Sequence, residues 1–119
     1  MDARRIGLIA FTSTFVACAQ EPAFKKALAE DPYAVAQEQA FALGRVLGGV
    51  RRCEGDAWQR PFHEFMAAKR KRGLDDTQTA VIAALVGGAE SEAIPEMLEC
   101  SAEGLSRRSA AIQAMRADW

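Results

Sequence analysis

The sequence predicts an all-α fold, a small antiparallel bundle of four or five helices with one disulfide. Three observations support this class. The helix-forming residues Ala, Leu, Glu, Gln and Arg are abundant, and long alternating runs of Val, Ile and Thr are absent. Apolar residues recur at spacings of three and four, and capping residues precede most of these segments. With 119 residues the chain forms one domain at most.

Residues 1–19 have the three parts of an export signal. Arg4 and Arg5 are positively charged, residues 6–17 are uncharged and mostly apolar, and 17–19 (ACA) give the small-x-small pattern of signal peptidase. We therefore expect a signal peptide over 1–19 and a single helical domain over 20–119, in the periplasm or secreted. Two alternatives are a lipoprotein acylated at Cys18 and a cytoplasmic protein in which this stretch is a core helix.

The longest predicted helix begins at Asp31-Pro32, an N-cap aspartate followed by proline, and ends near Cys53. A shorter helix is expected before it, over 21–30. Gly44 and Gly48 lie four apart on the long helix, where a second helix can approach the backbone closely. Its buried face is predicted to consist of Ala36, Ala40, Leu43, Leu47 and Val50.

A turn at 54–56 leads to the next helix, with Asp56 as a possible cap and the regular part starting near Gln59, so that Pro61 falls in the first turn. This helix ends in the basic run 69–72 (KRKR) and Gly73. Its apolar face is predicted to consist of Trp58, Phe62, Phe65 and Met66.

Asp75 and Gln78 form the capping-box pattern of a further helix, which Gly87-Gly88 should weaken or end. Pro95 suggests a short helix near Ile94. Ser101 caps a last helix over about 102–117. The buried faces are predicted to be Val81, Ile82, Leu85 and Val86 in the first of these helices, and Leu105, Ser109, Ile112 and Met115 or Arg116 in the last.

Cysteine count supports export. The chain has three cysteines, and removal or lipidation of Cys18 leaves Cys53 and Cys100 as an even pair. In an oxidising compartment we expect these two to form a disulfide. In a cytoplasmic protein they would instead be two buried thiols.

The remaining motifs exclude several chemistries. Net charge is −1, and consecutive helical residues such as Lys69, Arg70, Lys71 and Arg72 point about 100° apart, so nucleic-acid binding is not expected. The paired arginines Arg51, Arg52, Arg107 and Arg108 are expected to be exposed. The single histidine, His63, lies off the apolar face with no evident catalytic partner. No metal-ligand pair or cofactor-binding motif is present, so we predict neither metal, cofactor nor enzymatic activity.

One set of residues is a possible partner surface, although the same aromatic residues are also typical of ordinary core packing. The set comprises Trp58, Lys69, Arg70, Lys71, Arg72 and Trp119.

The order of these features resembles that of small uncharacterised exported alphaproteobacterial helical proteins with a cysteine pair. The shared pattern is LGxxLxxxRxC, then Trp, Met and a second Cys that opens the final helix. Here it is carried over about 40–119 by Leu43, Gly44, Leu47, Arg51, Cys53, Trp58, Met66 and Cys100. This resemblance implies the compartment and the fold, and it implies no catalytic residues.

Two functional hypotheses follow. The first is an exported, non-enzymatic helical protein that binds a protein or an envelope component and has no membrane span in its mature chain. The second is a cytoplasmic helical adaptor or regulator that acts through protein–protein interaction, as an oligomer. An enzyme would require a polar cleft that converges on His63 or on an Arg/Glu cluster.

Overall fold

Helix α2 (Pro32–Glu54) is the longest helix that the computed structural model describes. The described residues are 31–119, so the signal peptide expected over 1–19 and the helix expected over 21–30 lie outside them. The predicted bounds of this long helix are confirmed to within one residue. Its start is consistent with proline at the first helical position.

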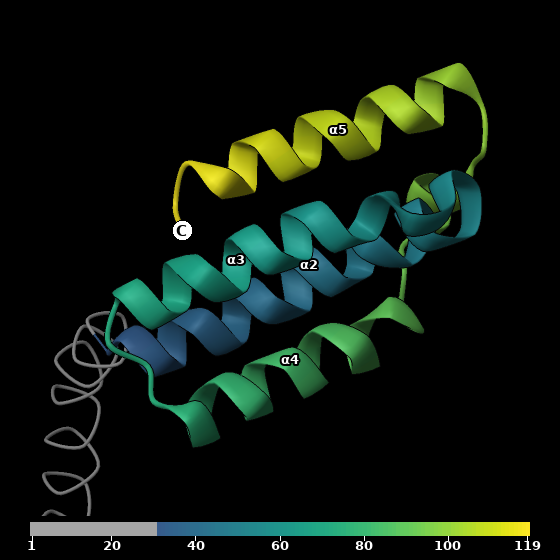
Figure 1. The fold of residues 1–119 in the computed structure, drawn as a ribbon. Coiled ribbons are helices and arrows are strands. Elements are labelled where there is room, and N and C mark those ends of the chain that lie inside the picture. Colours follow the sequence, from purple (N-terminus) through teal and green to yellow (C-terminus); the bar gives the residue numbers. More distant parts are fainter. Residues whose placement is uncertain (1–30) are drawn as a thin grey trace, which may run out of the picture. The chain divides into compact units, whose positions relative to one another are not determined.

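Three further α-helices and two short 3-10 helices follow α2 in the described part of the chain. They are η1 (Gly55–Trp58), α3 (Gln59–Lys71), α4 (Asp76–Glu90), η2 (Pro95–Leu98) and α5 (Ala102–Arg116). Each α-helix reverses the direction of the one before it, as Figure 1 shows. The predicted all-α class is confirmed.

Of the helices α3, α4 and α5, the last two begin at a side-chain cap that the sequence predicts. The Asp75 side chain accepts from the Gln78 amide at 2.8 Å and Gln78 Oε1 accepts from the Asp75 amide at 3.0 Å, which completes the predicted capping box of α4. Ser101 Oγ accepts from the Gly104 amide and caps α5, as expected. The expectation that Asp56 caps α3 is wrong, because the residue before that helix is Trp58 and no side chain caps it.

The core lies along one face of α2, and the predicted face is confirmed. The α2 residues in it are Ala36, Ala40, Leu43, Val46, Leu47 and Val50. Phe65 of α3 packs against this face and is itself met edge-on by Trp119, with ring centroids 5.3 Å apart. The other predicted apolar residues of α3 are half-buried around this cluster.

Helices α2 and α4 touch through backbone at the predicted glycines. A Cβ on Gly44 would overlap the carbonyl oxygen of Val86, and a Cβ on Gly48 would overlap that of Glu90. Because the contact advances by four residues on both helices, α2 and α4 run in the same direction (Figure 1). The glycine stripe is therefore the seam on which α4 lies.

One prediction for α4 is wrong, and a second is wrong in part, since only its alternative that Gly87-Gly88 ends the helix is contradicted. Val81 is 39 % exposed and does not belong to the buried face, which Ile82, Val86 and Ala89 form. Gly87-Gly88 neither ends nor breaks the helix, which continues to Glu90. The capping box at Asp75 and the backbone contact with α2 stabilise α4, and together they outweigh the loss of helix stability of about 1 kcal/mol for each glycine.

The buried face of α5 differs from the predicted one. Gly104, Arg108 and Ile112, spaced four apart, point inward, whereas Leu105 is 47 % exposed and Ser109 is exposed. The expectation that Arg108 is exposed is also wrong, because it is 1 % exposed. Ile112 is buried as expected, and Met115 packs at the edge of the core.

Candidate functional site

The end of α2 and the start of α5 are joined by a disulfide between Cys53 and Cys100, with an S–S distance of 2.04 Å. The segment 97–100 lies between the two helices. A Cβ on Gly49 would overlap the Met97 carbonyl oxygen, and a Cβ on Gly104 would overlap that of Glu99. The predicted pairing is confirmed in the structure, and glycines on both helices make room for the segment that carries Cys100.

Arg108 is a buried side chain that contacts the same region, between the end of α2 and the start of α5. Its Nε donates to Glu54 Oε2 at 2.7 Å, and its Nη1 donates to the carbonyl oxygens of Met97 at 3.0 Å and Glu99 at 2.6 Å. One buried guanidinium thus contacts the end of α2 and two backbone acceptors before α5. We call this set, Arg108 with Glu54, Met97 and Glu99, the arginine clasp.

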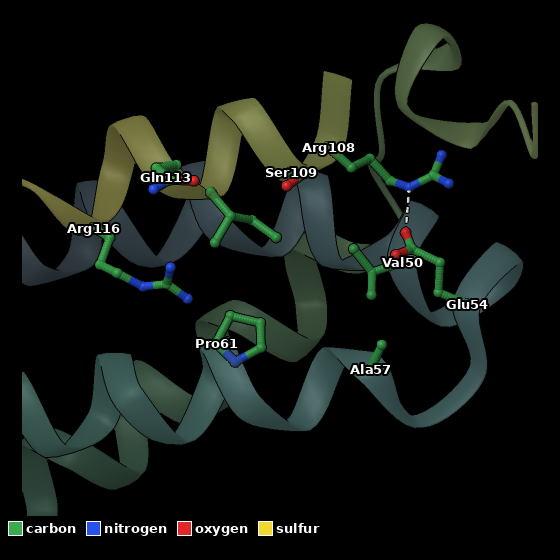
Figure 2. Close-up of a pocket in the computed structure, with 9 residues that line it drawn as sticks. Val50, Glu54, Ala57, Pro61, Arg108, Ser109, Gln113 and Arg116 are labelled. Carbon is green, nitrogen blue, oxygen red and sulfur yellow. Dashed lines mark hydrogen bonds and ion pairs between the residues drawn. The ribbon is translucent and has the colours of Figure 1, made fainter. Parts of the chain in front are cut away.

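A pocket of about 160 Å³ opens beside the clasp, between α2, α3 and α5. Figure 2 shows Arg108 directed at Glu54, while Arg116 extends from α5 toward Pro61 of α3. The lining residues are Val50, Glu54, Ala57, Pro61, Arg108, Ser109, Ile112, Gln113 and Arg116. Its two cations are both engaged, because Arg116 Nε lies 2.8 Å from Glu64 Oε2. The pocket is polar and charge-balanced.

His63 is exposed, and its ring centroid lies 5.5 Å from that of Phe62. The neighbouring carboxylate of Glu64 is directed elsewhere, since it pairs with Arg60 as well as with Arg116. Glu64 therefore does not orient His63 in the way that the carboxylate of a catalytic pair would.

The residues predicted as a partner surface separate into exposed and buried groups. Arg70, Lys71 and Arg72 are exposed, and Arg72 donates to the Trp119 carbonyl oxygen at 2.9 Å. Lys69 and Trp119 are buried, so these two members of the predicted partner surface are not exposed. The basic run is thus not a continuous exposed strip, because one member points into the core.

Trp58, the last residue of η1, is half-buried and contacts residues of α2 and α3. The Arg51 guanidinium carbon lies 3.9 Å from its ring centroid, and Phe62 packs beside it with centroids 5.7 Å apart. Arg51 also pairs with Glu90 of α4 at 2.9 Å. Arg51 thus links Trp58 to the end of α4, and part of the ring is covered by this cation.

Burial lowers the pKa of Lys69 below its ordinary value of 10.5, and the nearby Arg72 charge lowers it further. The ammonium nitrogen lies 5.4 Å from the centroid of the Phe65 ring, whose π face offers partial compensation. Its position on the Phe65 side of α3, one turn after that core residue, explains the burial.

Sequence reasoning missed Arg108, Glu54 and Glu64. One signal existed for Arg108, which lies four residues from both Gly104 and Ile112 and so shares their stripe. Nothing local pairs it with Glu54, which is 54 residues earlier. The Arg116–Glu64 pair likewise exists only because α3 and α5 come together.

Within residues 31–119, no three His, Cys, Asp or Glu side chains are grouped as a metal ion would require. No helix in that same range has the length and apolarity needed to cross a membrane. In comparisons with protein-family models, curated proteins and solved structures, nothing matches this chain at a significant level.

Proposed function

We propose that this chain is an exported, non-enzymatic helical bundle, latched by its disulfide, that binds a protein partner through the outer surface of α4. One observation carries the binding proposal. Between Asp76 and Glu90 the helix has no charged residue, yet Thr77, Ala80, Val81, Ala84, Gly87 and Gly88 are all exposed. Surface helices ordinarily have charged and polar residues on their outer face.

Helices α3 and α5 follow that ordinary pattern. On α5, Arg107 pairs with Glu99 and Glu103, and on α3 Arg60 pairs with Glu64. The uncharged outer surface of α4 therefore differs from the outer surfaces of α3 and α5. It is not a general property of an alanine-rich chain.

Two glycines strengthen the proposal. A Cβ built on Gly87 or Gly88 would meet nothing within 4 Å, so packing within this domain does not require glycine at either position. Each lowers helix stability by about 1 kcal/mol relative to alanine. Ala80, Ala84 and Gly88 lie four apart on one stripe, the arrangement that lets the backbone of another helix approach closely. The occupant that fits is an α-helix with an apolar face.

Site-specific photo-crosslinking tests this. A photoreactive residue replaces Ala84 in protein made in its source organism, with Ala110, an exposed alanine on α5, as the matched control. We expect a discrete adduct from position 84 and none from position 110. An adduct of twice the protein's own mass would identify the partner as a second copy. No adduct from position 84, or the same adducts from both positions, contradicts the proposal.

The export part of the proposal is supported by the disulfide and by the three-part pattern of residues 1–19. Disulfides persist in oxidising compartments and are rare in the cytoplasm. The cytoplasmic adaptor hypothesis requires reduced thiols and an uncleaved N-terminus, so it makes the opposite prediction for both.

A further inference from the structure

The disulfide and the arginine clasp join the same two segments of the chain. Cys53 is followed by Glu54, whose carboxylate accepts from Arg108 Nε at 2.7 Å. Cys100 is preceded by Glu99, whose carbonyl oxygen accepts from Arg108 Nη1 at 2.6 Å. Each cysteine is therefore adjacent in sequence to a residue that Arg108 contacts. These contacts do not involve the sulfur atoms, so they keep the two segments together whether or not the sulfurs are bonded.

The two sulfur atoms also lie near one common acceptor. The Leu98 carbonyl oxygen is 3.5 Å from Cys53 Sγ and 3.9 Å from Cys100 Sγ. A sulfur in a disulfide has no proton to donate, whereas a thiol is a weak hydrogen-bond donor. After reduction, a thiol at either position therefore has a carbonyl oxygen within reach, without any movement of the backbone. This region can accommodate the dithiol as well as the disulfide.

The two cysteines differ in their access to solvent. Cys100 is exposed and lies in the segment between η2 and α5, whereas Cys53 is half-buried in the last turn of α2. The rate of thiol–disulfide exchange depends on which sulfur is attacked and on the access to it. An external thiol should therefore react at Cys100, and Cys53 is then the leaving group.

We propose that Cys53–Cys100 is a reversible thiol–disulfide exchange site, at which Cys100 is attacked and the arginine clasp keeps the reduced cysteines within reach of each other. The thiolate of an external thiol bonds to Cys100 Sγ, the S–S bond breaks, and Cys53 leaves as a thiolate that takes a proton from water. A second external thiolate attacks the external sulfur and releases Cys100, which is protonated in turn. Two external thiols become one disulfide, and the protein gains two electrons and two protons.

The clasp should set how strongly the disulfide is favoured over the dithiol. A contact that keeps two groups close raises the effective concentration of one at the other, and a disulfide between them then resists reduction. Without Arg108, the segment 97–100 loses its hydrogen bonds to this side chain and can move away from α2 once the sulfurs separate. The reduced state gains freedom, so less reductant is needed to reach it. This inference stands apart from the α4 proposal, since none of these residues belongs to α4.

A redox titration of the full-length protein tests the coupling. The protein is equilibrated with mixtures of reduced and oxidised glutathione, its free thiols are alkylated, and peptide mapping reports each cysteine separately. We expect Arg108→Met to be half reduced at a ratio of [GSH]² to [GSSG] at least about tenfold lower than the wild type, which is ~30 mV for a two-electron couple. Equal ratios for the two proteins overturn the proposal.

Arg107→Met is the matched control for this titration. Arg107 is the neighbouring arginine on α5, but it is exposed and contacts Glu99 and Glu103 only through their carboxylates. It therefore does not hold the backbone next to Cys100, and we expect the wild-type ratio. A shift as large as that of Arg108→Met contradicts the role of the clasp.

Circular dichroism of the reduced proteins separates local coupling from unfolding. The reduced wild type should keep its helical signal, because the clasp remains, and loss of that signal on reduction overturns the proposal. If reduced Arg108→Met unfolds, Glu54→Gln decides instead. That variant removes the carboxylate and leaves the two carbonyl acceptors of Arg108 in place. We expect a smaller shift of the ratio in the same direction, and no shift contradicts the coupling.

Single-cysteine variants identify the attacked sulfur. Cys53→Ala leaves the thiol of Cys100, and Cys100→Ala leaves that of Cys53. With oxidised glutathione, peptide mapping should find the mixed disulfide at Cys100 forming at least about tenfold faster than that at Cys53, because exchange depends on access. Equal rates, or a faster reaction at Cys53, contradict the assignment.

The source of the external thiol is distinguished by two probes applied to the wild type at equal thiol concentration. Glutathione represents a small thiol, and reduced thioredoxin represents a protein dithiol. Faster reduction by one of them identifies the class that the exposed Cys100 accepts. Failure of both to reduce the disulfide while the protein stays folded overturns the proposal.

Discussion

At the scale of single residues, the buried charge of Arg108 has the largest consequence. Its three acceptors come from the end of α2 and from the segment before α5, so one side chain joins parts of the chain far apart in sequence. A buried charge is tolerated when its donors are used, and removal of one partner leaves the others without compensation.

Arg108→Met is therefore expected to lower the free energy of unfolding by about 3–5 kcal/mol, because it leaves the Glu54 carboxylate and two carbonyl oxygens unpaired. Arg107→Met is the control, since Arg107 is exposed and its ion pairs with Glu99 and Glu103 are worth at most about 1 kcal/mol. Urea denaturation measures both. Losses of similar size would show that the clasp does not stabilise the domain.

Lys69 gives a prediction about pH. Its pKa is lowered in the folded state by burial and by Arg72, whereas the unfolded value stays near 10.5. Between these values the unfolded chain binds more protons, so stability rises with pH in that interval. The wild type should therefore gain stability relative to Lys69→Met as pH increases toward 10.5. Unfolding free energies measured from pH 7 upward check this, with the exposed Lys71→Met as control. A difference that stays constant or falls contradicts it.

At the scale of elements, the α2–α4 seam depends on backbone contact. Gly44→Ala places a methyl group against the Val86 carbonyl, which cannot move without shifting α4, and overpacking of this kind costs about 1–3 kcal/mol. Gly88→Ala is the matched control, because its Cβ meets open space. We expect this second variant to be more stable by about 0.5–1 kcal/mol. Thermal unfolding compares them, and the same sign for both would exclude the seam as described.

Much of the architecture could be predicted from local pattern. The α2 face was readable because Ala40, Leu43 and Leu47 recur at spacings of three and four, and the α4 and α5 starts were readable because capping is chemistry between neighbours. The α5 face was not readable. Leu105 and Ile112 are seven residues apart and suggest that both lie on one buried stripe of α5. In the structure the buried stripe contains Arg108 instead, because the Arg108 guanidinium donates to acceptors elsewhere in the chain.

The candidate sites divide in the same way. The Cys53–Cys100 pairing followed from counting cysteines, and it needed no geometry. The polar pocket depends on residues of α2 and α3 that meet α5, and contacts between α2 and the end of the chain, such as Gln39 with Asp118, span most of the domain. Long-range contacts of this kind leave no periodic signal in the sequence.

At the scale of the whole molecule, the disulfide closes a long loop. Its cysteines are 47 residues apart, and restriction of the unfolded chain over such a loop stabilises the fold by about 4 kcal/mol. The double variant Cys53→Ala/Cys100→Ala should lose about 2–4 kcal/mol, since the arginine clasp still holds the same corner. Urea denaturation under oxidising conditions measures this loss. An unchanged urea midpoint would show that the disulfide does not stabilise the domain.

The central claim is that a helical domain, latched between the end of α2 and the start of α5, works in an oxidising compartment. Intact mass and peptide mapping of protein purified from its native source, without reductant, test this most directly. We predict an N-terminus at Gln20, a mass lower by two hydrogens than the reduced mature chain, and a linked peptide that contains Cys53 and Cys100. Three reduced thiols on a chain that retains residues 1–19 would contradict the claim.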